Sequence, residues 1–185
     1  ASGPGGVLLA FAIALGGGLI VGLVNGALTA YGKVAPFVVT LVGLLAYRSA
    51  AQALANGGSP IVQNQTFSAI GSNGLTLPGQ PPLVIYYSIL VFAGLIVLFD
   101  FMLRKTPFGR WVIAIGSNPR GAFYSGLPIA RVRMACFGLA GLCIGFSAFF
   151  HAARMSGISS ASDGLYWELD GIAAVVVGGT PLSGG

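Results

Sequence analysis

The residue types that could support catalysis are few in this chain of 185 residues and form no recognisable catalytic set. It has one histidine, His151, and two cysteines, Cys136 and Cys143. A metal site needs several His, Cys, Asp or Glu side chains converging on one ion, and covalent catalysis needs a nucleophile beside a base. The two cysteines lie seven residues apart on one expected helix, about 10 Å along its axis, too far for a disulfide. We therefore expect neither a metal site nor enzymatic activity.

A nucleotide site is also not expected. The phosphate-binding loop follows the pattern G-x-x-x-x-G-K-[ST]. The only Gly-Lys pair is Gly32-Lys33, which is followed by Val34 and has Ala27 where the first glycine should stand. We expect this chain to bind no cofactor of its own.

The low number of charged residues indicates the class of protein and therefore the kind of elements that position its side chains. Only 13 residues are charged, or 7% of the chain, and the mean hydropathy is +0.87. A soluble domain carries about 25% charged residues, and disordered chains are poor in apolar residues. A soluble domain and a disordered chain are both excluded, which leaves a membrane protein.

Four stretches are long and apolar enough to cross a bilayer, which requires about 20 residues. They are residues 7–30, 36–56, 83–103 and 134–153. A fifth run, Ile172–Val177, is too short and predicts a broken or re-entrant helix, or the start of a further span. We expect an all-α polytopic membrane protein with residues 1–185 forming one transmembrane domain. We expect no signal peptide, because that needs a basic n-region and the first 32 residues are uncharged. Because the sequence begins without Met and stops in mid-pattern at Gly185, we also expect it to be an internal portion of a longer polypeptide.

The basic residues indicate the orientation. Six of the nine fall into the segment 104–133: Arg104, Lys105, Arg110, Arg120, Arg131 and Arg133. Short loops rich in Lys and Arg stay in the cytoplasm. The net charge of +5 is therefore a topology signal, and we expect no nucleic-acid partner.

Glycines at every fourth position predict close helix packing. Gly18, Gly22 and Gly26 follow this spacing in the first span, and Gly141 and Gly145 do so in the fourth. Small residues at this spacing let helix backbones approach closely in lipid.

A few polar residues in or near the spans are candidates for lining a path, since such groups are costly in lipid. They are Asn25, Thr40, Arg48, Glu168 and Asp170. For Asn25 the alternative is an interhelical hydrogen bond, and for Arg48 it is snorkelling to the outer interface. Asp163, Glu168 and Asp170 also suit a helix N-terminus, and Asp100 suits an i,i+4 pair with Arg104.

Three motifs, in this order and spacing, carry a resemblance to a known family. The first is the turn Gly32-Lys33 followed by residues 35–41, APFVVTL. The second is Phe108-Gly109-Arg110, then residues 114–118, AIGSN, with Ala122 and Ser125-Gly126. The third is residues 168–180, ELDGIAAVVVGGT, ending at Leu182 and Gly184-Gly185. From about residue 16 to 185 the chain resembles the membrane permease subunits of bacterial ABC importers for simple sugars, of the ribose, xylose and galactose type.

The resemblance implies a multi-pass protein of the bacterial cytoplasmic (inner) membrane that imports a monosaccharide by alternating access. It implies a second permease copy, identical or related, a periplasmic sugar-binding protein outside, and separate ATPase subunits inside that use the ATP. It places a coupling helix in the loop 104–133, with Arg120 and Gly121 replacing the family's Glu and first Ala. The implied coupling residues are Arg110, Gly116, Asn118, Arg120, Gly121, Ala122 and Gly126. Pro119 can open this helix and Gly126 can close it, leaving about two turns.

Two alternatives remain at this stage. A permease for branched-chain amino acids would need a path that accepts an ammonium and a carboxylate. A passive channel or a structural membrane protein would need no ATPase partner.

Overall fold

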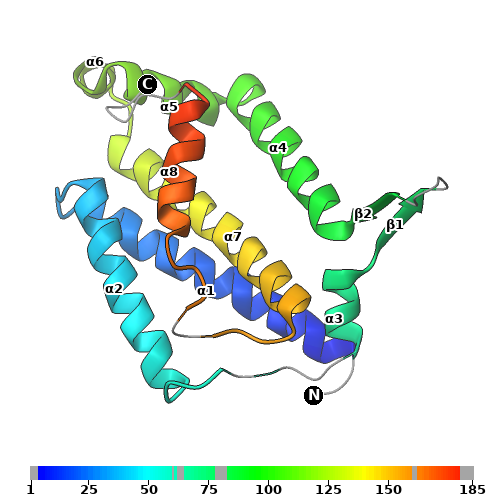
Figure 1. Cartoon of the computed structure of the whole chain (residues 1–185). Coiled ribbons are helices and arrows are strands. Elements are labelled where there is room, and N and C mark those ends of the chain that lie inside the picture. The colour runs from blue at the N-terminus through cyan, green and yellow to red at the C-terminus, as the bar shows by residue number, and fades with distance from the viewer. Residues whose placement is uncertain (1–3, 60, 62–64, 78–82, 160–161, 180–185) are drawn as a thin grey trace.

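The computed structural model describes residues 4–59, 61, 65–77, 83–159 and 162–179. Four long helices form the body of the molecule (Figure 1): α1 (Pro4–Ala30), α2 (Pro36–Leu54), α4 (Tyr87–Lys105) and α7 (Ile129–Met155). By length and composition all four can cross a membrane. The expected all-α membrane fold is confirmed.

Shorter elements connect the long helices. On one side of the bundle, α3 (Gln65–Ser72) leads into the hairpin β1 (Gly74–Leu77) and β2 (Leu83–Tyr86), which projects away from the helices (Figure 1). Its strands pair antiparallel, with Gly74 opposite Tyr86 and Leu77 opposite Leu83. At the other end lie α5 (Pro107–Ser117) and α6 (Pro119–Tyr124), and the described chain finishes in α8 (Trp167–Val177).

The largest differences between the helix bounds and the predicted spans are at the starts of the third and fourth spans. Residues 83–86 were expected in the third span but form β2, because the β-branched Val84 and Ile85 pair with Thr76 and Leu75 across the hairpin. The fourth span begins five residues before its predicted start, at Ile129. Arg131 and Arg133 fit in its first turns because long basic side chains reach the interface while their stems lie along apolar surface.

The glycine pattern produces the main helix contact. α1 and α7 pack antiparallel along their length, so that Gly18 lies beside Gly141 and Gly145, and Gly22 beside Gly141. A Cβ added at Gly18 would lie 2.9 Å from the backbone nitrogen of Gly145, and one at Gly22 would lie 3.0 Å from Gly141 Cα. Only glycine permits this approach, as the spacing predicted.

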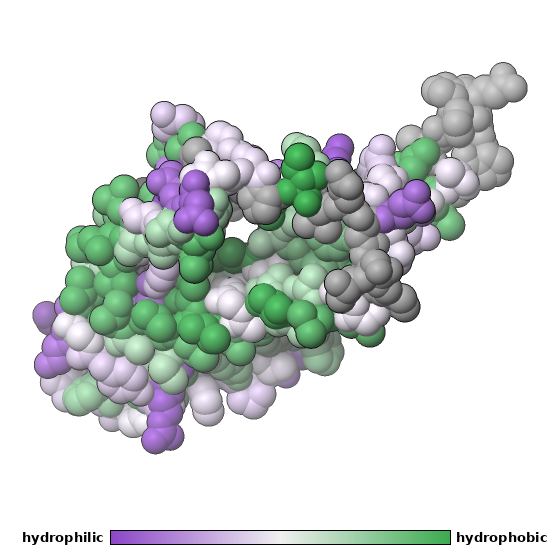
Figure 2. Space-filling model, turned by 90° about the horizontal axis from the view of Figure 1, so that it is seen from below, coloured by the Kyte–Doolittle hydropathy of each residue, from purple (hydrophilic) through white to green (hydrophobic). Residues whose placement is uncertain are grey.

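A small apolar core lies at each end of the α1–α7 seam. At the end near α3, Phe149 packs edge-on against Phe11 and Phe67, with ring centroids 5.0 and 5.4 Å apart. At the other end, Ile115, Ala122 and Val132 bury one another and join α5, α6 and α7. The rest of the surface is largely apolar, as Figure 2 shows for one face, and α4 and α8 contain no buried residue. Such faces suit lipid or further protein.

Candidate functional site

The predicted cytoplasmic loop folds into two capped helices at the end of the bundle opposite α3, called here the inner end. Thr106 caps α5, its hydroxyl accepting a hydrogen bond from the Gly109 amide at 3.3 Å, and Pro107 follows at the first helical position. Gly109 packs tightly on the end of α4, where a Cβ would lie 2.5 Å from Leu103 Cα. These features turn the chain sharply out of α4, leaving Arg110 exposed and Gly116 half-buried on α5.

The expected coupling helix is α6. The Asn118 side chain accepts a hydrogen bond from the Gly121 amide at 2.9 Å, and Pro119 takes the first helical position, as predicted. After Tyr124 the chain reaches Gly126, whose φ of +77° is the left-handed conformation that favours glycine. The helix has six residues, slightly less than the two turns expected.

The two faces of α6 differ sharply. Ala122 is 5% exposed and packs against Ile115 and Val132 in the inner core. Phe123 and Tyr124 are 69% and 87% exposed, and Arg120 is exposed as well. Ala122 therefore fixes α6 to α5 and α7, while the outward surface belongs to these three side chains. Sequence reasoning included Arg120 but missed the aromatic pair, which the motif does not mark; only helical spacing from Ala122 could have indicated it.

The charges are distributed unevenly between the two ends. The inner end and its flanking turns hold seven of the nine cations but one of the four acids, Asp100. Asp100 pairs with Arg104 at 2.6 Å, as the spacing predicted. The opposite end of the bundle, next to α3, is called here the outer end. There the Arg154 guanidinium lies 5.4 Å from the centroid of the Tyr86 ring, and Arg48 donates a hydrogen bond to a backbone oxygen of the loop before α8. The inner end is thus a strongly positive surface.

Asn25 and Thr40, two predicted pathway residues, bond within the protein. The Tyr47 hydroxyl of α2 donates a 3.0 Å hydrogen bond to the Asn25 side-chain oxygen of α1. This is the interhelical alternative considered for Asn25. The Thr40 hydroxyl donates to the backbone oxygens of Pro36 and Phe37, within its own helix.

Arg48 and the acidic residues surround the loop that leads into α8. The Arg48 guanidinium donates to the backbone oxygen of Asp163 at 3.4 Å. The Asp163 carboxylate accepts from the Ser159 amide at 2.8 Å and lies 3.8 Å from His151 Nε2 on α7. Glu168 and Asp170 stand in the first turn of α8, as their charge favours. Asp163 thus connects the loop before α8 to Arg48 of α2 and lies near His151 of α7.

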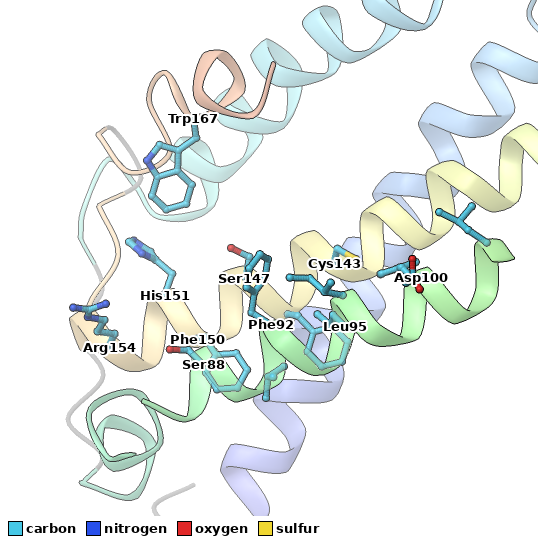
Figure 3. Close-up of a pocket in the computed structure, with 15 residues that line it drawn as sticks. Ser88, Phe92, Leu95, Asp100, Cys143, Ser147, Phe150, His151, Arg154 and Trp167 are labelled. Atoms are coloured by element: carbon cyan, nitrogen blue, oxygen red, sulfur yellow. The ribbon is translucent and has the colours of Figure 1, made fainter. Parts of the chain in front are cut away.

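A cleft of about 720 Å³ runs between α4 and α7 (Figure 3). Its walls are mostly apolar, with the hydroxyls of Ser88 and Ser147 along it and His151, Arg154 and Trp167 toward one end. Trp167 meets His151 edge-on, with ring centroids 4.9 Å apart. None of the five predicted pathway residues lines this cleft. The structure does not gather them there, and their role in transport stays a prediction.

The described residues offer neither a cluster of metal ligands nor a disulfide. Among them, no group of three or more His, Cys, Asp or Glu side chains comes together in a way that could hold a metal ion. Cys136 packs beside the inner core and Cys143 lines the cleft, and both are free thiols. The end of the third motif, Thr180 to Gly185, lies outside the described residues.

Comparison with known proteins identifies relatives over nearly the whole sequence. A family model described as "branched-chain amino acid transport system / permease component" matches residues 1–184. The L-arabinose ABC transporter permease of Azospirillum brasilense is 37% identical over 97% of this chain and 50% of its own length. The galactofuranose transporter permease of Escherichia coli K12 is 35% identical over 93% of this chain and 48% of its own.

The ribose import permease of the same Escherichia coli strain is 34% identical over 96% of this chain and 54% of its own length. The chain therefore spans about half the length of the curated relatives it matches. No solved structure gives a significant match.

Proposed function

The chain belongs to the family of branched-chain amino acid transport system permease components, and on this premise we propose that it is part of the permease subunit of an ABC importer for a monosaccharide. Family membership supports the permease role. The relatives named above support the sugar, since they are permeases for arabinose, galactofuranose and ribose. The nearly uncharged spans agree with a neutral cargo, which needs hydrogen bonds and aromatic faces and no fixed charge.

The proposal includes the partners of such a system. ATPase subunits would dock on the inner end, a periplasmic sugar-binding protein would dock on the outer end, and a second permease copy would complete the path. The location would be the bacterial inner membrane. ATP would be bound and hydrolysed by the ATPase subunits, with no cofactor on this chain and no catalytic role for it.

The packing of α6 connects the proposed ATPase docking surface to the long helices α7 and α1. Ala122 is buried against Val132 of α7, so a displacement of α6 by a docked ATPase is passed to α7. The close glycine contacts then pass a movement of α7 to α1, because closely packed backbones cannot slide independently. Closure of the ATPase subunits would in this way tilt the α1–α7 pair, which is the movement that alternating access requires.

The observation that carries this proposal is the capped helix α6, with one face buried and the other presenting exposed aromatic and basic side chains. The test uses the full-length protein with its ATPase and binding protein in proteoliposomes. Ala122→Phe should force α6 off the inner core and uncouple ATP hydrolysis from sugar uptake, because no space remains beside Ile115 and Val132. Ala122→Ser, which changes the volume little, is the control and should keep the coupling.

Unchanged sugar uptake by Ala122→Phe would refute this coupling assignment. The two rivals are separated in the same system. A branched-chain amino acid permease would show competition by leucine and none by pentoses. A passive channel would be fully active without an ATPase subunit.

A further inference from the structure

A second cavity, of about 750 Å³, lies at the inner end of the α1–α7 seam. Ala30 and Tyr31 form one wall, at the end of α1. The other wall is formed by the link after α6 and the first turns of α7, and its residues are Phe123, Leu127, Pro128, Ile129, Ala130, Arg131 and Arg133. The lining combines apolar side chains with two guanidinium groups, those of Arg131 and Arg133.

The two arginines have no carboxylate partner in the described part of the chain. Asp100 is the only acidic residue assigned to this end, and it is paired with Arg104. The remaining acids, Asp163, Glu168 and Asp170, belong to the opposite end. Guanidinium groups bind phosphates and carboxylates with two parallel hydrogen bonds, so the arginines complement an anionic group of either kind. The membrane position of the cavity favours a phosphate.

The position of the cavity indicates which kind of phosphate would enter it. α1 ends at Ala30 and α7 begins at Ile129, so two membrane-spanning helices meet the polar interface at this level. Tyr31 is 61% exposed, and tyrosine is enriched at the depth of the lipid headgroups.

An apolar stripe continues from the cavity along α1. Val24 and Leu28 are 45% and 50% exposed, and their spacing places them on the same helix face as Tyr31. A phospholipid has both parts that this surface requires, a phosphate for the arginines and an acyl chain for the stripe.

We propose that this cavity binds an anionic phospholipid of the inner leaflet, with its headgroup on Arg131 and Arg133 and an acyl chain along Val24 and Leu28. Basic pockets between transmembrane helices on the cytoplasmic side are suited to such headgroups. The competing occupant is an acidic segment of the ATPase. The lipid is favoured because a soluble partner would leave the stripe on α1 uncovered. The inference depends on the membrane position of the helices and not on the cargo that the protein carries.

The test compares lipids on the full-length permease without its partners. The protein is placed in nanodiscs of phosphatidylcholine alone or mixed with phosphatidylglycerol, and the midpoint of thermal unfolding is measured. We expect phosphatidylglycerol to raise the midpoint of the wild type. The double variant R131Q/R133Q should lose most of this rise, R131K/R133K should keep part of it, and R120Q, outside the cavity, should keep all of it. Soluble glycerol phosphate should have no effect, because it lacks the acyl chain.

An equal rise in the wild type and R131Q/R133Q would overturn the proposal, as would a wild type that does not respond to phosphatidylglycerol. In a second step the ATPase subunits are added to the same nanodiscs, and loss of their binding to R131Q/R133Q with an intact lipid response would assign the arginines to the ATPase and also overturn the proposal. Equal midpoints in phosphatidylcholine alone verify that the double variant folds. If it does not fold, each single variant, R131Q and R133Q, should lose part of the rise, and a full rise in both would contradict the proposal.

Discussion

At the scale of single residues, α6 uses one side chain to pack against the bundle and others to face a docking partner. Ala122 and Tyr124 are two positions apart on one short helix, yet they are 5% and 87% exposed. The family motif directs attention to Ala122, whose role in this structure is to hold the helix in place. The side chains available to a docking partner are those of Arg120, Phe123 and Tyr124.

Replacing Tyr124 with alanine should therefore weaken ATPase binding roughly tenfold, since exposed aromatic residues are frequent anchors of interfaces. The Tyr124 ring packs against its neighbour Phe123 on the same short helix, with centroids 5.9 Å apart, and its side chain is 87% exposed, so the unfolding midpoint of the permease should not change. Co-purification of the ATPase and titration of the purified subunits measure the effect. Tyr166→Ala, an exposed tyrosine at the outer end, is the matched control. Wild-type affinity in Tyr124→Ala would remove this residue from the docking face.

The Asn25–Tyr47 hydrogen bond makes a second prediction at this scale. Asn25→Ala and Tyr47→Phe should each destabilise the protein, and a double-mutant cycle should give a coupling energy of about 0.6 kcal/mol, typical of hydrogen bonds between membrane helices. Unfolding in mixed micelles measures it. Full additivity of the two changes would mean that the 3.0 Å contact does not contribute to stability.

At the scale of elements, the seam between α1 and α7 holds the bundle together. Gly17 and Gly18 are neighbours with opposite surroundings: a Cβ at Gly17 meets nothing within 4 Å, whereas one at Gly18 meets the backbone of Gly141 and Gly145. The same substitution at adjacent positions therefore isolates the effect of packing.

Gly18→Ala should destabilise the permease by about 1–3 kcal/mol, the usual cost of overpacking, because backbone atoms on both sides must move apart. Gly17→Ala should be neutral or slightly stabilising, since alanine is the better helix former. Thermal unfolding of the two variants in the same detergent gives the comparison. Equal midpoints would show that the seam is not the contact that determines stability.

Local sequence patterns predicted where the helices lie better than which distant residues contact one another. The four long helices follow from apolar length, the seam from glycine spacing, and the start of α6 from Pro119. Other features depend on residues far apart in the chain. The hairpin requires residues 74–77 to meet 83–86, and Arg48 binds a backbone oxygen 115 residues later. No local spacing encodes such pairings, and for this reason the contact between Arg48 and the loop before α8 was not predicted. The role of the candidate pathway residues in transport stays a prediction.

At the scale of the whole molecule, the two ends have different characters. The inner end has a firm apolar core, an excess of cations and a small capped helix with an exposed aromatic face. The outer end has a projecting hairpin and a loop held by Arg48 and Asp163. This division agrees with the proposed importer, in which ATPase subunits would act at the inner end and the binding protein at the outer end.

The most direct test of the central claim is uptake of radiolabelled monosaccharides by proteoliposomes that contain the full-length protein, its ATPase subunits and its binding protein. A panel of pentoses and hexoses is offered with and without ATP, and leucine is included as a competitor. We predict uptake of at least one sugar that requires ATP and the ATPase and that leucine does not reduce. Sugar uptake at the same rate without the ATPase, or ATP-driven uptake of leucine with no uptake of any sugar, would contradict the proposed function.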